Sequence, residues 1–355
     1  MRSETIIIRA DGSVEPGDVP IKRSRNTYIL TNDIQVAGDG IIIGKDDITI
    51  NGDNHTLKGI GRHCGIDVSK RKNVTISNIW IQNFDTGIRL NSAVKNRIVE
   101  NIVENSMIGL FLNYSSNNEI AGNEFVNCGL IVTSSYNNII EDNHVNGKSL
   151  IYLESETNSR INGINAGQVI LVRCENILVE NLYLSNATTG VELWETSNAR
   201  IKGNRIENNN LYGIALVNSS NNEIIENVVK NNGCGIFLSE SSNNNKIFHN
   251  AFIKNMVQAS IYESGENVWD DGLKGNYWSD YHEIARALNT PYIIDRNNMD
   301  KYPLIKNLEE EIKKLEEYLW KLEQLKSEGK VSEKIYKTLK EKYECEMEKL
   351  VEELE

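Results

Sequence analysis

Short runs of alternating apolar and polar residues fill the chain up to about residue 304. The phrase I-x-x-N-x-(apolar) recurs in about nine copies, in steps of 18 to 23 residues. A second phrase, glycine followed by apolar-x-apolar, stays in the same frame from Gly87-Ile88-Arg89-Leu90 to Gly235-Ile236-Phe237-Leu238. Gly, Asn and Ser divide the runs into pieces of two to four residues. Such pieces predict β-strands and leave no room for helices.

A unit of about 22 residues made of short strands cannot bury its own apolar face, whereas a stack of such units can. We therefore expect an all-β solenoid, a single-stranded parallel β-helix with three short strands per coil. Successive coils would pair about 4.8 Å apart. The repeat count predicts about 10 coils, on the order of 50 Å of stacked sheet. A leucine-rich repeat is excluded because its L-x-x-L-x-L spacing and helical half are absent.

Asparagine is unusually frequent, with 48 copies in 355 residues. It forms helices and ordinary strands poorly, so this excess indicates a positional role. At the same corner of successive coils, an Asn side chain can bond the next Asn and otherwise unpaired backbone groups. We assign this ladder to the asparagines of the first phrase: Asn78, Asn101, Asn123, Asn143, Asn181, Asn204, Asn227 and Asn250. The glycine of the second phrase is expected at a bend that a Cβ atom would obstruct.

The composition changes to Glu, Lys and Leu after Pro303. Apolar residues then recur at helical spacing in two stripes separated by Ser327-Glu328-Gly329-Lys330, which predicts an antiparallel α-helical hairpin of coiled-coil type. The stripes are Leu308, Ile312, Leu315, Leu319 and Leu322, then Ile335, Leu339, Tyr343, Met347, Leu350 and Leu354. Because two helices leave an apolar seam open, we expect self-association, docking on the solenoid or another protein partner.

The repeats resemble those of the right-handed parallel β-helix superfamily, of the NosD type and of the carbohydrate-binding and sugar-hydrolase type. The opening from Ile8 to Thr31 is similar to that of archaeal β-helix surface proteins. The segment Gly275-Asn276-Tyr277-Trp278-Ser279-Asp280-Tyr281, followed by Pro291 to Leu304, resembles their closing segment. We expect an N-terminal cap over 1–45, repeats over 46–268, an aromatic cap over 269–304 and the hairpin over 305–355.

The resemblance implies a right-handed helix and leaves the activity open. Relatives with this fold include polysaccharide lyases, epimerases and hydrolases, so a carbohydrate-active enzyme is one alternative. NosD-type relatives are linked to copper delivery to an exported reductase, so a metal-delivery accessory protein is another. Copper favours clustered Cys, His or Met, whereas the 5 Met and 5 His of this chain are dispersed. We expect no metal site and no cofactor.

Between the two apolar residues of each second phrase lies a residue that should face outward. In successive coils these outward residues form a column, and the residues two positions further on form a neighbouring column. Both columns are unusually apolar in the middle of the solenoid, which indicates a binding surface. We assign the outer strip to Phe111, Tyr152, Glu192, Trp194 and Phe237. A polysaccharide or surface glycan could stack on it, or a protein partner could cover it.

Catalytic candidates on this face are weak. Glu192 is an outward carboxylate, and Glu154 lies two coils away and one column over, about 12 Å by strand geometry. Acid–base cleavage of a glycoside needs two carboxyl groups about 5–10 Å apart. Arg173 near Glu154 is a further candidate, as a lyase base. We therefore expect a non-catalytic scaffold or binding module that assembles through its C-terminal helices.

The net charge of −12 disfavours nucleic acid as a partner, since phosphate binding requires a surplus of Lys and Arg. No run of about 18 apolar residues occurs, so no membrane span is expected. The 5 cysteines are widely spaced and form no C-x-x-C pair, which indicates buried thiols rather than disulfides or a zinc site. As written, the sequence has no signal peptide and favours the cytoplasm, or the cell surface or export if the N-terminus is truncated.

Overall fold

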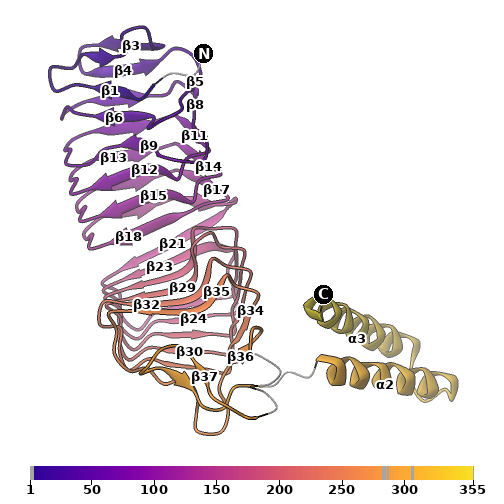
Figure 1. Cartoon of the computed structure of the whole chain (residues 1–355). Helices are drawn as coiled ribbons and strands as arrows, with labels where there is room; N and C mark the ends of the chain where they lie inside the picture. The colour runs from indigo at the N-terminus through magenta and orange to yellow at the C-terminus, as the bar shows by residue number, and fades with distance from the viewer. Residues whose placement is uncertain (1–3, 282–284, 286–287, 305–307, 355) are drawn as a thin grey trace. The chain divides into compact units, whose positions relative to one another are not determined.

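The computed structural model describes residues 4–281, 285, 288–304 and 308–354. The side chains of 308–313 and 350–354, including four of the predicted stripe residues, lie outside the described part. The chain divides into two compact units, 1–304 and 305–355, which we describe separately. The first unit is a right-handed β-solenoid of about 11 turns with three sheets, so the predicted fold class is confirmed (Figure 1).

The N-terminal solenoid (residues 4–145) contains three parallel sheets, with one strand of each sheet in most turns. Sheet A holds β1 (Ile6–Ile8), β6 (Ile41–Ile43), β9 (Cys64–Asp67), β12 (Thr86–Asn91), β15 (Ile108–Asn113) and β18 (Leu130–Thr133). Sheet B holds β4 (Thr27–Leu30), β7 (Thr49–Asn51), β10 (Thr75–Ser77), β13 (Arg97–Val99), β16 (Glu119–Ala121) and β19 (Ile139–Glu141). Sheet C holds β5 (Ile34–Gln35), β8 (Thr56–Lys58), β11 (Trp80–Gln82), β14 (Ile102–Glu104), β17 (Glu124–Val126) and β20 (His144–Val145). Antiparallel strands β2 (Val14–Glu15) and β3 (Ile21–Ser24) close sheets A and B at the N-terminal end.

The C-terminal solenoid (residues 148–304) repeats this plan. Sheet A′ holds β21 (Lys148–Glu154), β23 (Ala166–Val172), β26 (Thr189–Trp194), β29 (Tyr212–Val217), β32 (Cys234–Ser239) and β35 (Val257–Tyr262). Sheet B′ holds β22 (Arg160–Asn162), β24 (Leu178–Glu180), β27 (Arg200–Lys202), β30 (Glu223–Ile225) and β33 (Lys246–Phe248). Sheet C′ holds β25 (Tyr183–Ser185), β28 (Arg205–Glu207), β31 (Val228–Lys230), β34 (Ala251–Ile253) and β36 (Tyr277–Trp278). The antiparallel pair β37 (Tyr292–Ile293) and β38 (Met299–Asp300) follows.

The two solenoids are joined by a hairpin. Strands β20 and β21 pair antiparallel, so sheet C of the first solenoid continues as sheet A′ of the second in one 12-stranded sheet. The connecting residues Asn146 and Gly147 both have positive φ, of 53° and 71°, which is the backbone of a type I′ turn. The expectation of one uninterrupted stack of coils is therefore wrong, because the chain reverses direction at this turn.

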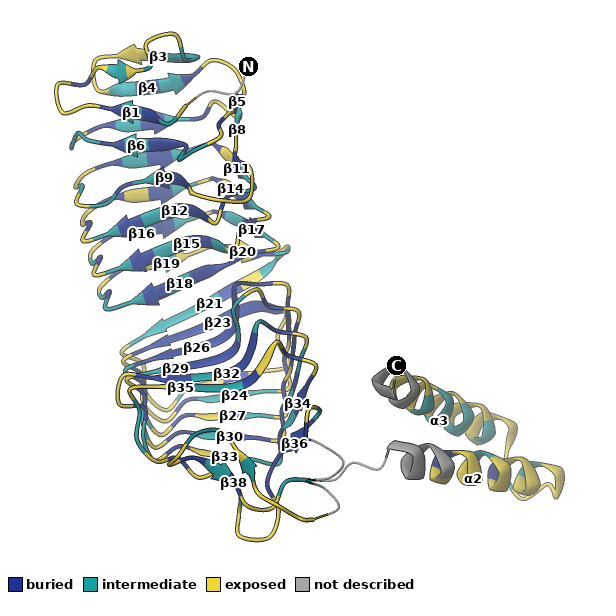
Figure 2. Cartoon of the chain, viewed as in Figure 1, coloured by how far each residue is buried: buried dark blue, intermediate teal, exposed yellow. Residues whose placement is uncertain are grey.

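The outer face of sheet A′ covers the open end of the N-terminal solenoid. Ile170, Val172 and Trp194 point outward from sheet A′, yet they are buried in the same apolar cluster as Leu130 and Val132 of β18. The inward residues of β23 and β26 belong to the second core. Figure 2 shows β23 and β26 as largely buried strands in the part of the C-terminal solenoid next to the first one. This contact explains the apolar character of the middle of the outer face, which covers a core end instead of facing solvent.

Side chains from sheet A′ also satisfy the free edge of β18. The backbone N–H groups of Gly129, Leu130 and Val132 donate to Thr188 Oγ1 (2.8 Å), Gln168 Oε1 (3.0 Å) and Glu192 Oε1 (3.1 Å), respectively. Gln168 Nε2 also donates to the carbonyl oxygen of Leu130 (2.7 Å). An unpaired strand edge inside a protein would be costly, and these bonds remove that cost.

The predicted asparagine ladder is present in both solenoids. Asn101 Nδ2 donates to Asn123 Oδ1 (3.0 Å), and Asn123 Nδ2 donates to Asn143 Oδ1 (2.9 Å). In the second solenoid, Asn204, Asn227, Asn250 and Asn276 form the equivalent column with side-chain bonds of 3.0 Å. Each of these Oδ1 atoms also accepts the backbone N–H of the preceding member. The Asn side chains thus replace main-chain bonds that the corner cannot make.

Two of the residues assigned to the ladder lie one position before it. In their turns the ladder position is Ile79 and Leu182, whose backbone N–H groups donate to Asn101 and Asn204. Asn78 and Asn181 have φ of 55° and 56° and occupy the left-handed corner instead. Asparagine tolerates this conformation, so it is frequent at the corner as well as at the adjacent ladder position, which explains the one-residue error in the alignment.

The glycine of the second phrase is required by a close backbone approach. A Cβ atom on Gly109 would lie 2.7 Å from both the carbonyl oxygen of Gly129 and a ring carbon of Phe125. A contact this short cannot be accommodated without moving the neighbouring turn.

Aromatic side chains cover the other end of the C-terminal core. Trp269 and Trp278 are fully buried, and the Trp278 ring stacks between Phe252 (4.7 Å between centroids) and Tyr292 (4.2 Å). Trp278 Nε1 donates to the buried carboxylate of Asp300 (2.9 Å). These rings shield the last apolar layer, so the aromatic segment contributes packing at this end.

The second unit contains helices α2 (Leu308–Ser327) and α3 (Glu333–Leu354), as predicted. Gly329 between them has φ of 67°, suited to a helix end. Across the pair, Lys340 Nζ contacts Glu323 Oε1 (3.1 Å), which is consistent with antiparallel helices. Neither described helix has an apolar stretch long enough for a membrane span.

We predict that Asn227→Leu lowers the free energy of unfolding by about 1–3 kcal/mol, because it leaves buried backbone carbonyls and two donors of Asn204 unpaired. Urea denaturation followed by circular dichroism measures the change. The control Asn297→Leu alters an exposed side chain and should change stability by less than about 0.5 kcal/mol. Equal stability of Asn227→Leu and the unmodified protein would contradict a stabilising ladder.

Candidate functional site

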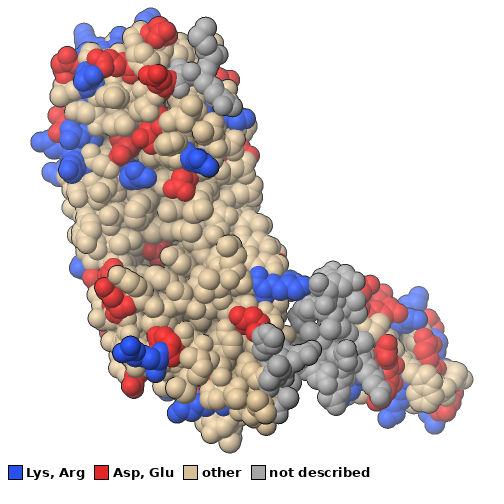
Figure 3. Space-filling model, in the orientation of Figure 1, with Lys and Arg blue, Asp and Glu red and all other residues tan. Residues whose placement is uncertain are grey.

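A cleft of about 370 Å³ opens where the two solenoids meet. One wall comes from the outer face of sheet A and includes Ile108, Phe111, Ile131 and Thr133. The facing wall comes mainly from sheet A′ and its loops and includes Thr189, Glu192, Trp194, Tyr212, Ala215 and Phe237. We call this site the junction cleft. Figure 3 shows the surface hollowed about midway along the solenoid, where few charged side chains lie.

The two walls exist because the outer faces of sheets A and A′ meet at the reversal. In a straight solenoid, Ile131 of β18 and Tyr152 of β21 would belong to one continuous column. Ile131 instead pairs only backward with Phe111, while Tyr152 pairs forward with Ile170. The break in pairing lets the outer faces converge, so residues from separate turns line one concave site.

Aromatic rings give the junction cleft an apolar surface. The rings of Tyr212 and Phe237 stack with their centroids 4.6 Å apart and their planes 15° apart. Phe111 contributes a half-buried ring from the facing wall, and Tyr262 lies exposed at the rim. Half-buried rings retain an accessible face, so they can contact an apolar surface of a ligand.

Glu192 is the buried carboxyl group of the cleft. It is 3% exposed, and its Oε1 accepts the N–H of Val132, whereas Oε2 is buried without a hydrogen-bond partner. Desolvation raises the pKa of Glu192 to about 8, and the Val132 N–H opposes this only in part. The carboxyl group is therefore mostly protonated at neutral pH.

A second unpaired polar atom lies in the same wall. Thr189 is 1% exposed, and its Oγ1 has no hydrogen-bond partner. Three buried side-chain oxygen or nitrogen atoms in the described residues lack partners, and two of them, Thr189 Oγ1 and Glu192 Oε2, belong to residues that line the junction cleft. Such groups are costly unless a bound molecule satisfies them.

The structure separates the residues of the predicted outer strip. Phe111, Glu192, Trp194 and Phe237 line the junction cleft, but Tyr152 does not. Trp194 is 2% exposed, and its Nε1 donates to the hydroxyl of Tyr136 (3.1 Å). The expectation of an open strip along the solenoid is thus wrong in its middle, because the end of the first solenoid covers that part.

The other catalytic candidates are engaged elsewhere. Glu154 accepts from the Tyr152 hydroxyl (2.7 Å) and from the backbone N–H of Asn137 (2.6 Å). Arg173 donates to Glu195 (2.7 Å) and its guanidinium lies over the Tyr136 ring, 3.4 Å from its centroid. The expected pairing of Arg173 with Glu154 is therefore corrected: both residues stabilise the contact between the solenoids.

Sequence reasoning missed Thr189 and Tyr212, since their turns were treated as equivalent to all others. Two signals marked the junction: the steps shorten to 20, 20 and 18 residues around it, and Asn146-Gly147 is a strong hairpin signal. Together they predict a reversal in the repeat. Which outer residues then converge depends on tertiary packing that the repeat does not encode.

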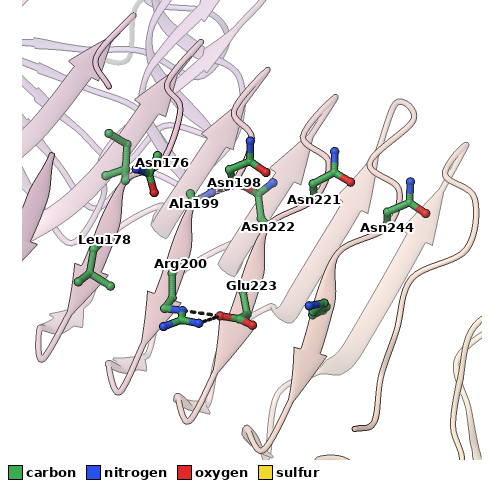
Figure 4. Close-up of a pocket in the computed structure, with 11 residues that line it drawn as sticks. Asn176, Leu178, Asn198, Ala199, Arg200, Asn221, Asn222, Glu223 and Asn244 are labelled. Atoms are coloured by element: carbon green, nitrogen blue, oxygen red, sulfur yellow. Dashed lines mark hydrogen bonds and ion pairs between the residues drawn. The ribbon is translucent and has the colours of Figure 1, made fainter. Parts of the chain in front are cut away.

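A larger and more polar groove of about 570 Å³ lies along sheet B′ (Figure 4). Its upper edge is a column of exposed asparagines at left-handed corners: Asn176, Asn198, Asn221 and Asn244. Below them, Arg200 and Glu223 form an ion pair on neighbouring strands. The asparagine column repeats from turn to turn, and the described lining residues of the groove include no buried polar atom without a hydrogen-bond partner.

The described residues contain no group of three or more His, Cys, Asp or Glu side chains that could hold a metal ion. Cys64, Cys128, Cys174 and Cys234 are buried and free, and Cys345 is exposed. Burial raises the pKa of the Cys128 thiol to about 12, and its Sγ contacts the carbonyl oxygen of Val103 (3.2 Å). Desolvation raises the pKa of all four buried thiols, so they carry little thiolate at neutral pH.

The raised pKa of Glu192 predicts a pH-dependent stability. Its folded value of about 8 exceeds the ordinary value of 4.5, so its contribution is complete below pH 4.5 and declines as the pH rises through 8. We predict that unmodified protein loses stability relative to Glu192→Gln by about 1.4 kcal/mol per pH unit within this window.

Urea denaturation of both proteins at several pH values between about 5 and about 9 measures the difference. Subtracting the two curves removes the other titrating groups, which both proteins share. A difference that stays constant across the range would mean that Glu192 ionises normally in the folded protein.

Comparison with solved structures finds similarity to an alginate lyase from Paenibacillus sp. str. FPU-7, with 13% identity and a TM-score of 0.31 over 64% of this chain and 92% of that chain. The mannuronan C-5 epimerase A-module of Azotobacter vinelandii is similar with 15% identity and a TM-score of 0.26, over 71% and 73% of the two chains. No curated protein matches the sequence significantly.

Family comparison gives a match to the NosD family, described as periplasmic copper-binding protein. The matched segments are residues 2–161 and 151–283, which together cover well over half of the chain. The repeats, the β-solenoid and this match agree, and the protein is a member of the NosD family.

Proposed function

We propose that the protein is a non-catalytic binding scaffold whose junction cleft holds part of a glycan. The observation that carries this proposal is the combination of half-buried aromatic walls with two buried, unpaired oxygens in one cleft. Concave sites with apolar walls and a few convergent polar groups are typical of small-ligand sites.

A sugar ring matches this combination because it has an apolar C–H face and polar hydroxyl edges. Its C–H face can stack on Phe237 or Phe111, while its hydroxyls can bond Thr189 Oγ1 and Glu192 Oε2. Both walls belong to hydrogen-bonded sheets, so the site is formed before the ligand arrives and little ordering cost opposes binding.

The absence of a paired acid and base among the described candidates favours binding over turnover. A glycosidase needs two cooperating carboxyl groups, and a lyase needs a base near its substrate. Glu154 and Arg173 are committed to Tyr152 and Glu195, respectively. The buried Glu192 could act as a general acid, and the two other carboxyl groups of the cleft, Glu240 and Glu263, are exposed at its rim, where a water-excluded acid–base pair is not formed.

Metal delivery, which the family description would suggest, does not fit the described residues. Copper sites need several Cys, His or Met ligands directed at one point. The four buried thiols are dispersed singly through the solenoids, and His55, His63 and His249 each face a different aspartate.

We predict that labelled full-length protein binds glycans on an array and that Phe237→Ala weakens this binding at least about fivefold, because a stacking surface is lost. The matched control is Trp80→Ala, which removes a 40% exposed aromatic from sheet C, away from the cleft. Melting temperatures verify that both variants fold. Equal binding by Phe237→Ala and the unmodified protein would exclude the junction cleft as the glycan site.

We further propose that the C-terminal hairpin mediates self-association. Leu315 and Leu322 are buried, but Tyr318, Trp320 and Ile335 remain 52%, 66% and 52% exposed. A two-helix unit with so small a buried core gains stability by adding helices from a second copy. This assembly would present more than one cleft to a polymer and raise the apparent affinity.

Light scattering tests the assembly. We expect full-length protein to have at least twice the monomer mass, whereas protein lacking residues 306–355, or carrying Trp320→Lys, should be monomeric. The control Lys334→Ala alters an exposed charge and should leave the mass unchanged. A monomeric mass for the unmodified protein would exclude self-association.

A further inference from the structure

Three buried side-chain atoms in the described residues lack a hydrogen-bond partner, and two of them belong to residues of one strand that line the junction cleft. The strand is β26, which contributes Thr189 and Glu192. Each buried polar group without a hydrogen-bond partner lowers the stability of the fold, so two of them on one strand call for an explanation. Both residues belong to the lining of the cleft, so a ligand bound there would lie beside these two groups.

The hydrogen-bonding state of Glu192 is fixed by its surroundings. Oε1 accepts the N–H of Val132 at 3.1 Å, so the proton of the neutral acid resides on Oε2. Burial keeps the group neutral at pH 7 by raising its pKa to about 8. Oε2 is then a hydrogen-bond donor, and the adjacent Thr189 hydroxyl can donate or accept.

The remaining charge of the cleft is negative. Among its lining residues that the structure describes, the ionised side chains are the carboxylates of Glu240 and Glu263, both exposed at the rim, and none is Lys, Arg or His. An anionic ligand would lose its hydration in the cleft without meeting a cation and would also be repelled by the rim. A ligand that carries hydroxyls and no charge meets neither penalty.

We infer that the junction cleft selects uncharged hydroxylated rings, such as neutral hexose units, and rejects acidic sugars such as uronates. This inference rests on the proposed glycan-binding function and names the class of glycan. Thr189 and Glu192 would bond ring hydroxyls, while Phe111 and Phe237 would contact the apolar ring face. Glu240 and Glu263 act as selectivity residues at the rim.

Matched oligosaccharides test the selection, because a uronate differs from its neutral hexose only at C6. Isothermal titration calorimetry at pH 7 compares β-1,4-mannotetraose with tetramannuronate, and cellotetraose with β-1,4-tetraglucuronate, on full-length protein. We expect the neutral member of at least one pair to bind at least about tenfold more tightly, which corresponds to about 1.4 kcal/mol.

Reversing the charge of the two rim carboxylates is the second test of the selection. Glu240→Lys combined with Glu263→Lys should raise affinity for the uronate at least about fivefold and change affinity for the neutral partner less than about twofold. Glu141→Lys is the matched control, since it reverses an exposed carboxylate on sheet B outside the cleft and should change neither affinity.

The outcomes separate the two proposals. Uronates that bind as tightly as their neutral partners, or more tightly, would overturn the selection for uncharged rings and leave the glycan-binding function standing. A rim reversal that fails to raise uronate affinity would likewise overturn the selection alone. If neither pair nor any glycan on the array binds, the proposed function itself is overturned.

Discussion

An open solenoid end exposes an apolar layer and a row of unpaired backbone groups, and the structure depends on how each such end is covered. At the N-terminal end of the first solenoid, antiparallel strands β2 and β3 end the parallel sheets, and at the last turn of the second solenoid Trp269 and Trp278 cover the apolar layer. A third end arises inside the chain, where the Asn146-Gly147 turn reverses its direction. There the outer face of sheet A′ covers the first core, and Gln168, Thr188 and Glu192 satisfy the edge of β18.

This internal end accounts for the main difference between sequence and structure. Period, strand length and the ladder could be predicted, because each depends on contacts between equivalent residues of neighbouring turns. The hairpin of helices could be predicted because its apolar residues recur at helical spacing. The burial of Ile170 and Trp194 could not, since it depends on a contact between non-equivalent turns. Outward apolar residues in a repeat have two explanations, a ligand surface or a second packed layer, and pattern alone does not distinguish them. Local signals near residue 146 indicated where the second explanation applies.

The candidate site was predictable to the same extent. Phe111, Glu192 and Phe237 could be identified because they occupy outward positions of the repeat, and they do line one cleft. Thr189 and Tyr212 could not be identified from the repeat, because they become part of a cleft only when the outer face of sheet A lies opposite them. The asparagines Asn78 and Asn181 illustrate a smaller limit. Two adjacent corner positions both favour Asn, one for the ladder and one for the left-handed backbone, so the residue type does not fix the register.

The position of the cleft follows from the same covering contact. The end of the first solenoid meets the outer face of sheet A′, and this contact leaves a space beside it. The walls of that space are outer faces of the two solenoids, which elsewhere carry solvated side chains. Glu192 belongs to both features, because Oε1 closes the edge of β18 while Oε2 remains unpaired beside the cleft. The structural bond orients the carboxyl group, and burial by the same contact keeps it protonated. A polar group that is held by one oxygen and left unsatisfied at the other is pre-organised for a ligand, at a cost in stability that the extended ladders can offset.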